Sequence, residues 1–321
     1  SAASDVYKRQ DQERAERFVR SHGAQASYTS VERLLADSRV DVVFIASPNH
    51  LHAEHAKLAA EAGKHVLVEK PMATTTSDAV AIIESCKVNG VKLAVGFQLR
   101  YHPGHIEARK LVQDGVLGQV SFIHSLIGSG IRGETQREIR SGLRSWWEAP
   151  DMVGNAMTFI GSGVHAMDAM ENVLGQTVVE VAAITDGQTA ETPLESLASL
   201  TLRFSGGAIG TLCSSSRVPD AINDVTVYGS DGRIILKDSS RPVMGGGLEI
   251  NSETVNSSVI YESDALALAK WQIEGFNRAI TRDEESYATG MDGLRSVQIT
   301  EAMIESAKTR RIVRVEPIQV N

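Results

Sequence analysis

Short apolar runs alternate with amphipathic stretches in the first third of the chain. Residues 40–46 read Val-Asp-Val-Val-Phe-Ile-Ala, a β-branched run too short for a helix, and the alanine-rich stretch 51–62 ends before Gly63. Glycine is the residue expected just past a helix end, so the pattern predicts a strand followed by a helix. A nearly continuous apolar strand is typical of a parallel sheet covered on both faces.

The same alternation continues along the chain. Residues 65–68 predict a second strand, residues 77–88 a helix with Ser77 as its N-cap, and residues 91–97 a third strand, while a helix over 13–21 precedes them all. Strands that alternate with helices imply right-handed crossovers and a doubly wound parallel sheet. In such sheets, ligands bind outside the carboxyl ends of the strands.

Three polar turns follow the predicted strands: Ser47-Pro48-Asn49, Glu69-Lys70-Pro71 and Gly96-Phe97-Gln98. Each of them alone could be an ordinary turn, because short motifs are weak signals. The carboxyl ends of parallel strands meet at one edge of a sheet, so we expect the three turns to converge on one crevice.

The pattern changes after about residue 101, where strand-like segments follow one another. Ser205-Gly206-Gly207 and Ser230-Asp231-Gly232 have the composition of hairpin turns, so an antiparallel sheet is predicted. Helical periodicity at 156–174, 266–280 and 294–307 predicts helices over one face of this sheet, and the other face is expected to meet a second subunit. The predicted strands are residues 120–127, 178–185, 196–204, 208–215, 224–228 and 233–236.

Composition narrows the function. The net charge of −8 gives no electrostatic signature of nucleic-acid or lipid binding, and no apolar run approaches the roughly 20 residues that span a bilayer. Cys86 and Cys213 have no Cys or His at metal-ligand spacing, so neither a metal site nor a disulfide framework is expected. Small-molecule chemistry without a nucleic-acid or membrane partner is favoured, in a chain long enough for about two domains.

Several motifs recur here in the order and spacing of a known family. The first ones are Ser47-Pro48-Asn49-x-x-His52, Glu69-Lys70-Pro71 and Gly96-Phe97-x-x-Arg100-Tyr101-x-Pro103. Further along come Gly163-x-His165-x-x-Asp168, Tyr228-Gly229-x-x-Gly232 and Gly290-x-Asp292-Gly293-Leu294. From about Asp11 onward the chain resembles the glucose-fructose oxidoreductase/inositol dehydrogenase (Gfo/Idh/MocA) family.

The resemblance implies a Rossmann-type dinucleotide-binding domain over residues 1–101. It also implies, over residues 102–321, an α+β domain with a large, mostly antiparallel open sheet that binds substrate and forms the oligomer. The activity implied is hydride transfer between NAD or NADP and a sugar, inositol or related polyol. A cytoplasmic homodimer or homotetramer, joined through the open sheet face, is expected.

Lys70 and His165 are the candidate catalytic residues. Oxidising a secondary alcohol requires a base for the hydroxyl proton, and reducing a ketone requires the same group as an acid. A free lysine titrates near pH 10.4, but desolvation beside a positively charged nicotinamide would lower its pKa, and histidine titrates near neutrality. Without the family match, Lys70 reads as a solvated strand-end lysine and His165 as a helix histidine bonded to backbone.

The resemblance also implies binding roles for other residues. The predicted cofactor contacts are Ser47, Pro48, Asn49, His52, Glu69, Lys70, Pro71, Gln98 and Arg100. The predicted substrate contacts are Lys70, Tyr101, Trp147 and His165. Trp146 and Trp147 read equally well as core aromatics or as a lid, and Asp168 is expected to be structural.

The chain departs from the family pattern in two places. The family opens with a strand, a glycine-rich turn and a helix that bind the pyrophosphate, whereas Ser1 to Gln10 show neither strand alternation nor Gly-x-Gly. We interpret these ten residues as foreign sequence joined to a truncated start, against the rival view of a natural loss. An incomplete sheet, weak dinucleotide binding and an undetermined NAD or NADP preference would follow.

The second departure is Gly161, which stands four residues before His165 where many family members carry an aspartate. This feature favours a non-catalytic dinucleotide or sugar sensor as an alternative, whereas intact Lys70 and His165 favour an enzyme. A glycosidase that uses tightly held NAD is a further alternative.

Overall fold

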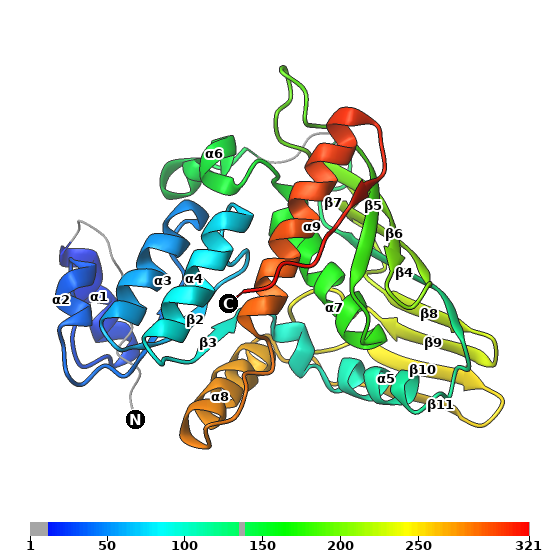
Figure 1. The fold of residues 1–321 in the computed structure, drawn as a ribbon, viewed down its shortest axis with the longest axis horizontal. Coiled ribbons are helices and arrows are strands. Elements are labelled where there is room, and N and C mark those ends of the chain that lie inside the picture. The colour runs from blue at the N-terminus through cyan, green and yellow to red at the C-terminus, as the bar shows by residue number, and fades with distance from the viewer. Residues whose placement is uncertain (1–11, 135–138, 321) are drawn as a thin grey trace.

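The computed structural model describes residues 12–134 and 139–320, which form two sheets with helices packed around them. The segment Ser1–Gln10, interpreted above as foreign, lies outside the described residues. The smaller sheet and its helices lie at one end of the molecule and the large sheet at the other, with α9 (Gly290–Thr309) running between them (Figure 1).

The smaller sheet is parallel, with the order β1 (Val42–Ile45), β2 (His65–Val68) and β3 (Leu93–Val95). α3 (His52–Glu61) follows β1 and α4 (Thr76–Val88) follows β2, while α1 (Gln12–His22) and α2 (Val31–Leu35) precede the sheet. The predicted strand–helix alternation is therefore confirmed. The N-cap of α4 is Thr75, whose hydroxyl accepts a hydrogen bond from the N–H of Asp78, so the prediction of Ser77 as the cap was wrong.

Helices from both ends of the chain cover this sheet. Side chains of β2 and β3 on one face, such as Val66 and Val95, share a core with α3, α4 and the first half of α9. On the other face Leu67 and Ala94 pack against Phe276 of α8 (Ala267–Thr281). The helix predicted over 266–280 was assigned to the large sheet, and that assignment was wrong because periodicity identifies an apolar face but not the sheet that receives it.

β1 departs on one face from the expected burial on both faces. Val42 is 36% exposed and Phe44 is 44% exposed, although Ile45 at the end of the strand is buried. β1 is the edge strand of the described sheet, and Phe276 of α8 packs on β2 and β3. The apolar run 40–46 was therefore read correctly as a strand and wrongly as a strand covered on both sides.

The large sheet has nine strands in the order β11-β10-β9-β8-β4-β7-β6-β5-β12, and the pairing of β4 with β7 is parallel. These are β4 (Val120–Gly128), β5 (Val178–Thr185), β6 (Leu197–Phe204), β7 (Ile209–Ser215), β8 (Val225–Gly229), β9 (Gly232–Lys237), β10 (Gly247–Ser252), β11 (Asn256–Ile260) and β12 (Val313–Arg314). The prediction of a mostly antiparallel sheet is confirmed. It missed β10, β11 and β12.

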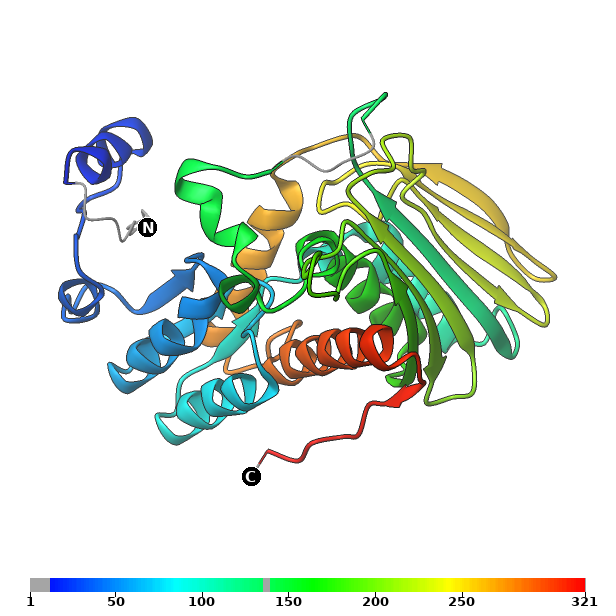
Figure 2. The same ribbon diagram turned by 90° about the horizontal axis from the view of Figure 1, so that it is seen from above.

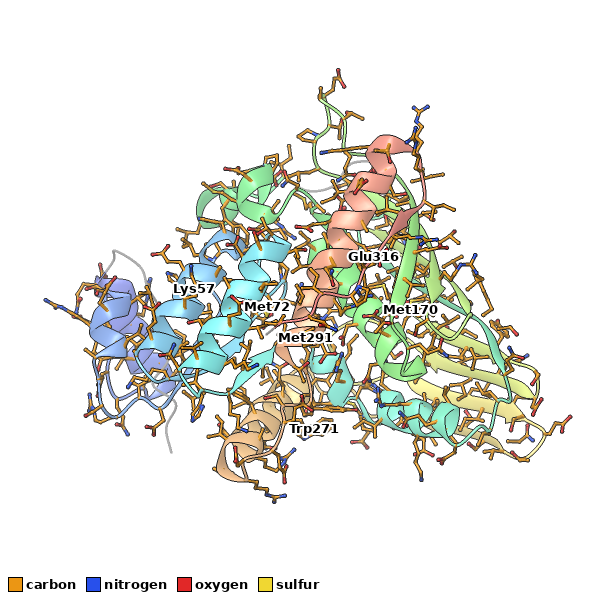
Figure 3. The ribbon with its side chains drawn as sticks, viewed as in Figure 1. Lys57, Met72, Met170, Trp271, Met291 and Glu316 are labelled. Carbon is orange, nitrogen blue, oxygen red and sulfur yellow. The ribbon has the colours of Figure 1, made fainter. Side chains whose placement is uncertain are left out.

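One face of the large sheet packs against α5 (Pro103–Gln113), α7 (Val164–Leu174) and the second half of α9 (Figure 2). Met170 of α7 lies in this core, whereas Met72 lies in the core of the smaller sheet beside α9 (Figure 3). α9 contributes Leu294 to the core of the smaller sheet and Met303 to the core of the large sheet, so a single helix connects the two cores.

Four short elements complete the region between the sheets. They are η2 (Gln98–Tyr101), η3 (Gly142–Glu148), α6 (Pro150–Val153) and the π-helical turn η4 (Phe159–Gly163), which runs directly into α7. η1 (Asn49–Leu51) leads from β1 into α3.

Candidate active site

The polar turns of the parallel sheet leave from the same edge, as predicted. Ile45 pairs with Val68, and Val68 with Val95, so the three strands end in register. The backbone N–H of Glu69 donates to Ile45, and that of Gly96 donates to Val68, which ties each turn to its neighbour. The turns after β1, β2 and β3 therefore lie side by side.

His52 joins two of these turns. Its Nδ1 lies 2.8 Å from the carbonyl oxygen of Pro71, and its Nε2 lies 2.8 Å from that of Ser47. Burial lowers the pKa of His52 to about 4, so the ring is neutral and donates to one of the two carbonyls at a time. Ser47 also contacts His55, at 3.0 Å between Oγ and Nδ1. His52 therefore links the turn after β1 to the turn after β2. Its contact with the cofactor stays a prediction.

Asn49 is buried and donates its side-chain amide to the carbonyl of Val153 in α6, at 3.0 Å. This bond attaches the turn after β1 to the segment that leads into η4. The predicted contact of Asn49 with the cofactor is not tested by this geometry.

Lys70 lies where the loop after β2 meets η4. Its Nζ donates to the carbonyl oxygen of Gly161 at 2.6 Å and to that of Ile160 at 3.1 Å. The peptide bond between Lys70 and Pro71 is cis. A π-helical turn leaves carbonyls without regular helical partners, and such turns are frequent at functional sites, so η4 presents free acceptors to the amine.

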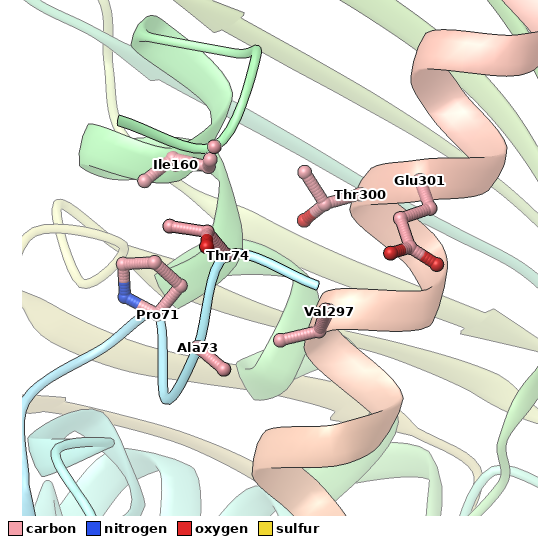
Figure 4. Close-up of a pocket in the computed structure, with 8 residues that line it drawn as sticks. Pro71, Ala73, Thr74, Ile160, Val297, Thr300 and Glu301 are labelled. Carbon is pink, nitrogen blue, oxygen red and sulfur yellow. The ribbon is translucent and has the colours of Figure 1, made fainter. Parts of the chain in front are cut away.

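Apolar side chains pack together next to the contact between Lys70 and η4 (Figure 4). Pro71, Ala73 and Ile160 meet side chains of α9 around a cavity of about 10 Å³, which is lined by Pro71, Ala73, Thr74, Gly154, Ile160, Val297, Thr300 and Glu301. Glu301 accepts hydrogen bonds from the backbone N–H and the hydroxyl of Thr76. α9 therefore supports both partners of the Lys70 contact.

Burial dominates the protonation of Lys70. It lowers the pKa of the amine to about 8, with Glu69 opposing the shift and the positive charge of Arg140 adding to it. For Glu69, burial raises the pKa of the carboxyl group and the charge of Lys70 opposes that rise. A lysine with a pKa near 8 holds a useful fraction of free amine at neutral pH, as a proton-transfer group requires.

His165 is the second residue of α7 and is 3% exposed. Burial, and then the positive charge of Lys70, lowers the pKa of His165 well below its usual range, so the imidazole is neutral. Its Nδ1 is buried and has no hydrogen-bond partner among the described residues. The structure thus brings the two predicted catalytic residues close enough to interact electrostatically.

A polar cavity of about 310 Å³ lies beside η4. Its lining includes Gly161 and Ser162 of η4 together with Ser129, Gly130, Ile131, Glu134, Arg140, Met157, Thr158 and Ser216. A side chain at position 161 would extend toward Trp147, whose ring is 3.8 Å from where its Cβ would stand. Trp147 stacks on Trp146, at 4.8 Å between ring centroids, and carries the guanidinium of Arg140 on its face at 4.0 Å.

The remaining predicted site residues follow β3. The side-chain oxygen of Gln98 is buried without a hydrogen-bond partner among the described residues. Arg100 forms a buried ion pair with Asp168, at 2.7 Å, and another with Asp292, at 2.9 Å. The ring of Tyr101 packs edge-on against Tyr287, at 5.3 Å between ring centroids. The cofactor role of Arg100 and the substrate role of Tyr101 stay predictions, and Asp168 lies in the structural setting expected for it.

Sequence reasoning missed Glu195, the residue two positions before β6. It is 0% exposed, and its carboxylate accepts hydrogen bonds from the backbone N–H of Phe159, the first residue of η4, and from that of Met157, two residues earlier. A single glutamate before a strand usually lies at the surface, so no pattern in the sequence indicates this role.

The residues at the strand ends fit the nicotinamide end of a dinucleotide. Buried polar atoms normally have partners, and Gln98 Oε1 and His165 Nδ1 have none among the described residues, which is the situation expected of atoms that meet a bound ligand. In the described part of the chain, no strand-to-helix turn of the parallel sheet is glycine-rich. A parallel sheet with these strand-end groups, next to an α+β domain with a polar cavity, defines a dinucleotide-dependent oxidoreductase.

Comparison with known families gives the same class. Residues 5–97 match an oxidoreductase family with an NAD-binding Rossmann fold, and residues 109–316 match the C-terminal alpha/beta domain of that family. The chain therefore belongs to the Gfo/Idh/MocA oxidoreductase family, and the resemblance drawn from its motifs is confirmed.

Individual relatives are distant but cover most of the chain. D-xylose 1-dehydrogenase (NADP(+)) 2 of Haloferax volcanii is 26% identical over 95% of this chain and 90% of its own length. 1,5-Anhydro-D-fructose reductase of Ensifer adhaerens is 27% identical over 95% of this chain and 88% of its own length. Aldose-aldose oxidoreductase from Caulobacter crescentus, solved with glycerol, superimposes with a TM-score of 0.82 at 26% identity, covering 96% of this chain and 90% of that one.

Across residues 12–134 and 139–320, no helix combines the length and the apolar character needed to cross a membrane.

Proposed function

We propose that this protein transfers a hydride between NAD or NADP and a sugar or related polyol, with Lys70 as the group that moves the hydroxyl proton. The observation that carries the proposal is the position of the Lys70 amine: it follows the second parallel strand, is held by two carbonyls of η4 and has a pKa lowered to about 8. The xylose dehydrogenase and the anhydrofructose reductase among the relatives support the substrate class.

When bound, the nicotinamide ring accepts or donates the hydride. The chain supplies the rest of the chemistry. In oxidation the free amine of Lys70 takes the proton from the substrate hydroxyl, and in reduction its ammonium returns a proton to the carbonyl oxygen. Neutral His165 offers a ring nitrogen as a hydrogen-bond partner for the same oxygen, which fixes the orientation of the reacting carbon.

The cavity beside η4 suits a polyol. Its hydroxyls from Ser129, Thr158, Ser162 and Ser216 can pair with sugar hydroxyls, and the ring of Trp147 offers a flat apolar surface next to Gly161. An indole face and several hydroxyl groups are a combination that matches the two sides of a sugar ring. Trp147 is then a substrate contact, as the family resemblance implied, and not only a core aromatic.

The direct test is a screen of sugars and polyols with NAD and with NADP, followed through the change in absorbance at 340 nm. Turnover with at least one sugar supports the proposal. Saturable sugar binding without any absorbance change, across both cofactors, would instead support the sensor that Gly161 suggested.

The pH dependence of the same reaction identifies the proton-transfer group. Because the base must be unprotonated, the oxidation rate should rise with pH through the pKa of Lys70, with the midpoint of the rise near pH 8, and level off at higher pH. His165→Gln should lower turnover about 10- to 100-fold through lost orientation but leave this rise in place. Loss of the rise in the His165 variant would transfer the role to the histidine.

The open face of the large sheet is the expected subunit interface. Phe122 and His124 of β4 and Tyr228 of β8 stack in a row on this face, with about 6 Å between their ring centroids, and Ile184 of β5 is 78% exposed beside β6. Exposed aromatic and aliphatic side chains on a sheet face favour cover by another subunit, so a homodimer or homotetramer through this face is expected. Light scattering at micromolar concentration tests this, and a monomer would contradict it. The cytoplasmic location stays a prediction.

A further inference from the structure

The carbonyls that hold Lys70 belong to a segment fixed at a second point. Glu195 accepts a hydrogen bond from the N–H of Phe159 at 2.8 Å and one from the N–H of Met157 at 3.0 Å. Phe159 immediately precedes Ile160, whose carbonyl, with that of Gly161, accepts the hydrogen bonds of the Lys70 amine. The glutamate contact at Phe159 therefore lies two positions before Gly161, which makes the shorter contact with the lysine.

Glu195 is a buried carboxylate with a complete set of donors. Besides the two backbone N–H groups, it accepts a bond from the side-chain amide of Gln188 at 3.1 Å, and its own backbone carbonyl accepts one from the hydroxyl of Thr158 at 3.2 Å. Burial raises the pKa of Glu195, and these N–H donors oppose that rise by stabilising the ionised form. Burying a charge is costly unless hydrogen bonds satisfy it, so this geometry holds the segment firmly.

The segment is also held from β7. The hydroxyl of Ser214 donates to the carbonyl of Thr158 at 3.2 Å. Gly163 lets the ring of Phe159 and the side chain of Ser214 approach, because a Cβ there would lie 2.5 Å from the ring and 3.0 Å from Ser214 Cβ. The carbonyls of Ile160 and Gly161 accept hydrogen bonds from the titratable amine of Lys70.

We propose that Glu195 is a positioning residue for Lys70, which it holds through the backbone of residues 157–161. The proposal rests on the proposed function, in which Lys70 transfers the proton. Glu195 itself does not touch the amine. It fixes the two acceptors that keep the amine at the edge of the parallel sheet.

The charged and titratable groups that face Lys70 come from three elements. Glu69 precedes it in the same loop, Arg140 lies before η3, and His165 lies on α7. Since burial has the largest influence on the pKa of Lys70, admitting water should raise that pKa from about 8 toward its ordinary value of 10.5. This rise should outweigh the loss of the two carbonyl acceptors, which by themselves favour the charged ammonium.

Glu195→Gln is the test, because it keeps the shape but places an amide group among N–H donors. The matched control is Glu191→Gln, an exposed glutamate in the same loop. Competitive acetylation across a pH series, with mass spectrometry of the peptide that contains Lys70, measures the pKa of this amine without cofactor. We expect a rise of about half a unit or more in Glu195→Gln and no change in Glu191→Gln.

Two further variants keep the test decisive. Adding Gln188→Glu to Glu195→Gln gives the new amide an acceptor, so the pKa of Lys70 should return toward 8. Glu195→Asp keeps the charge on a shorter side chain and should produce a smaller rise in the pKa of Lys70. This variant takes the place of Glu195→Gln if Glu195→Gln does not fold. An unchanged or lowered pKa of Lys70 in the folded variants would overturn the proposal.

The kinetic measurements separate this inference from the proposed function. Glu195→Gln should move the rise of the oxidation rate to higher pH and lower the rate at pH 7 severalfold, without weakening cofactor affinity. If Lys70→Ala retained turnover, the proposed function would fail whatever the acetylation result. If Lys70→Ala lost turnover while Glu195→Gln left the pKa of Lys70 unchanged, only the role of Glu195 would fail.

Discussion

Replacing Lys70 with alanine should reduce turnover by about 100- to 10,000-fold, the usual contribution of a positioned acid or base. The amine is the group that follows β2 at the carboxyl edge of the sheet, and its lowered pKa of about 8 suits proton transfer near neutrality. Cofactor affinity should change less than about threefold, because we expect most dinucleotide contacts to come from the other strand ends. Steady-state rates at saturating substrate, together with calorimetric titration of the dinucleotide, measure both.

The matched control is Lys87→Ala, which removes an exposed lysine at the end of α4 and should leave turnover unchanged. Lys70→Met adds a second comparison, because it fills the same space and leaves only the carbonyls of Ile160 and Gly161 without their donor. Both Lys70 variants should lose turnover while remaining folded in a thermal unfolding experiment. Turnover within tenfold of the wild-type rate in either would remove Lys70 from the proton-transfer step.

The local sequence pattern was sufficient to predict the edge of the parallel sheet from which Lys70 extends. The apolar runs around Val43, Leu67 and Ala94 are short and β-branched, and each is followed by a polar turn, so strand ends and their in-register arrangement could be predicted. Hairpin chemistry at Gly206 and Asp231 likewise placed the turns of the large sheet.

Contacts between distant segments could not be predicted in this way. The acceptors of Lys70 lie about 90 residues further along the chain, and their usefulness depends on a π-helical turn that no local periodicity signals. β11, Asn256–Ile260, escaped prediction because it is exposed throughout and lacks an apolar face. Glu195 escaped because its sequence neighbourhood is that of a surface glutamate, whereas the fold buries it.

Arg100 shows a related limit, because a motif singled out this residue but did not identify its contacts. The motif Arg100-Tyr101 suggested a cofactor contact, yet the guanidinium donates to Asp168, to Asp292 and to the carbonyl of Tyr287. It thereby joins η2, α7, α9 and the loop before α9, so it fixes the helix that carries His165. Motif resemblance conveys that a residue matters, and only the contacts show which groups it meets.

Arg100→Met should therefore lower the free energy of unfolding by about 3–5 kcal/mol, as expected when one partner of a buried ion pair is removed. Arg100 is 8% exposed and Asp168 is 4% exposed, so the carboxylate would be left buried without its cation and close to Asp292. Chemical denaturation at pH 7 measures the loss. Arg132→Met, which removes an exposed pair with Asp220, should cost less than about 1 kcal/mol and serves as the control.

The pKa of Asp168 determines how the loss of stability in Arg100→Met should depend on pH. Burial, opposed by Arg100, already raises the pKa of Asp168 to about 6. An acid whose pKa is higher in the folded than in the unfolded state destabilises the fold when it ionises, so that stability falls as pH rises through the interval between the two values. Without Arg100 the folded pKa rises further, and Arg100→Met should lose more stability at pH 8 than at pH 5. Adding Asp168→Asn should recover part of the loss at pH 8, and a loss that is the same at both pH values would contradict an uncompensated Asp168 charge as its cause.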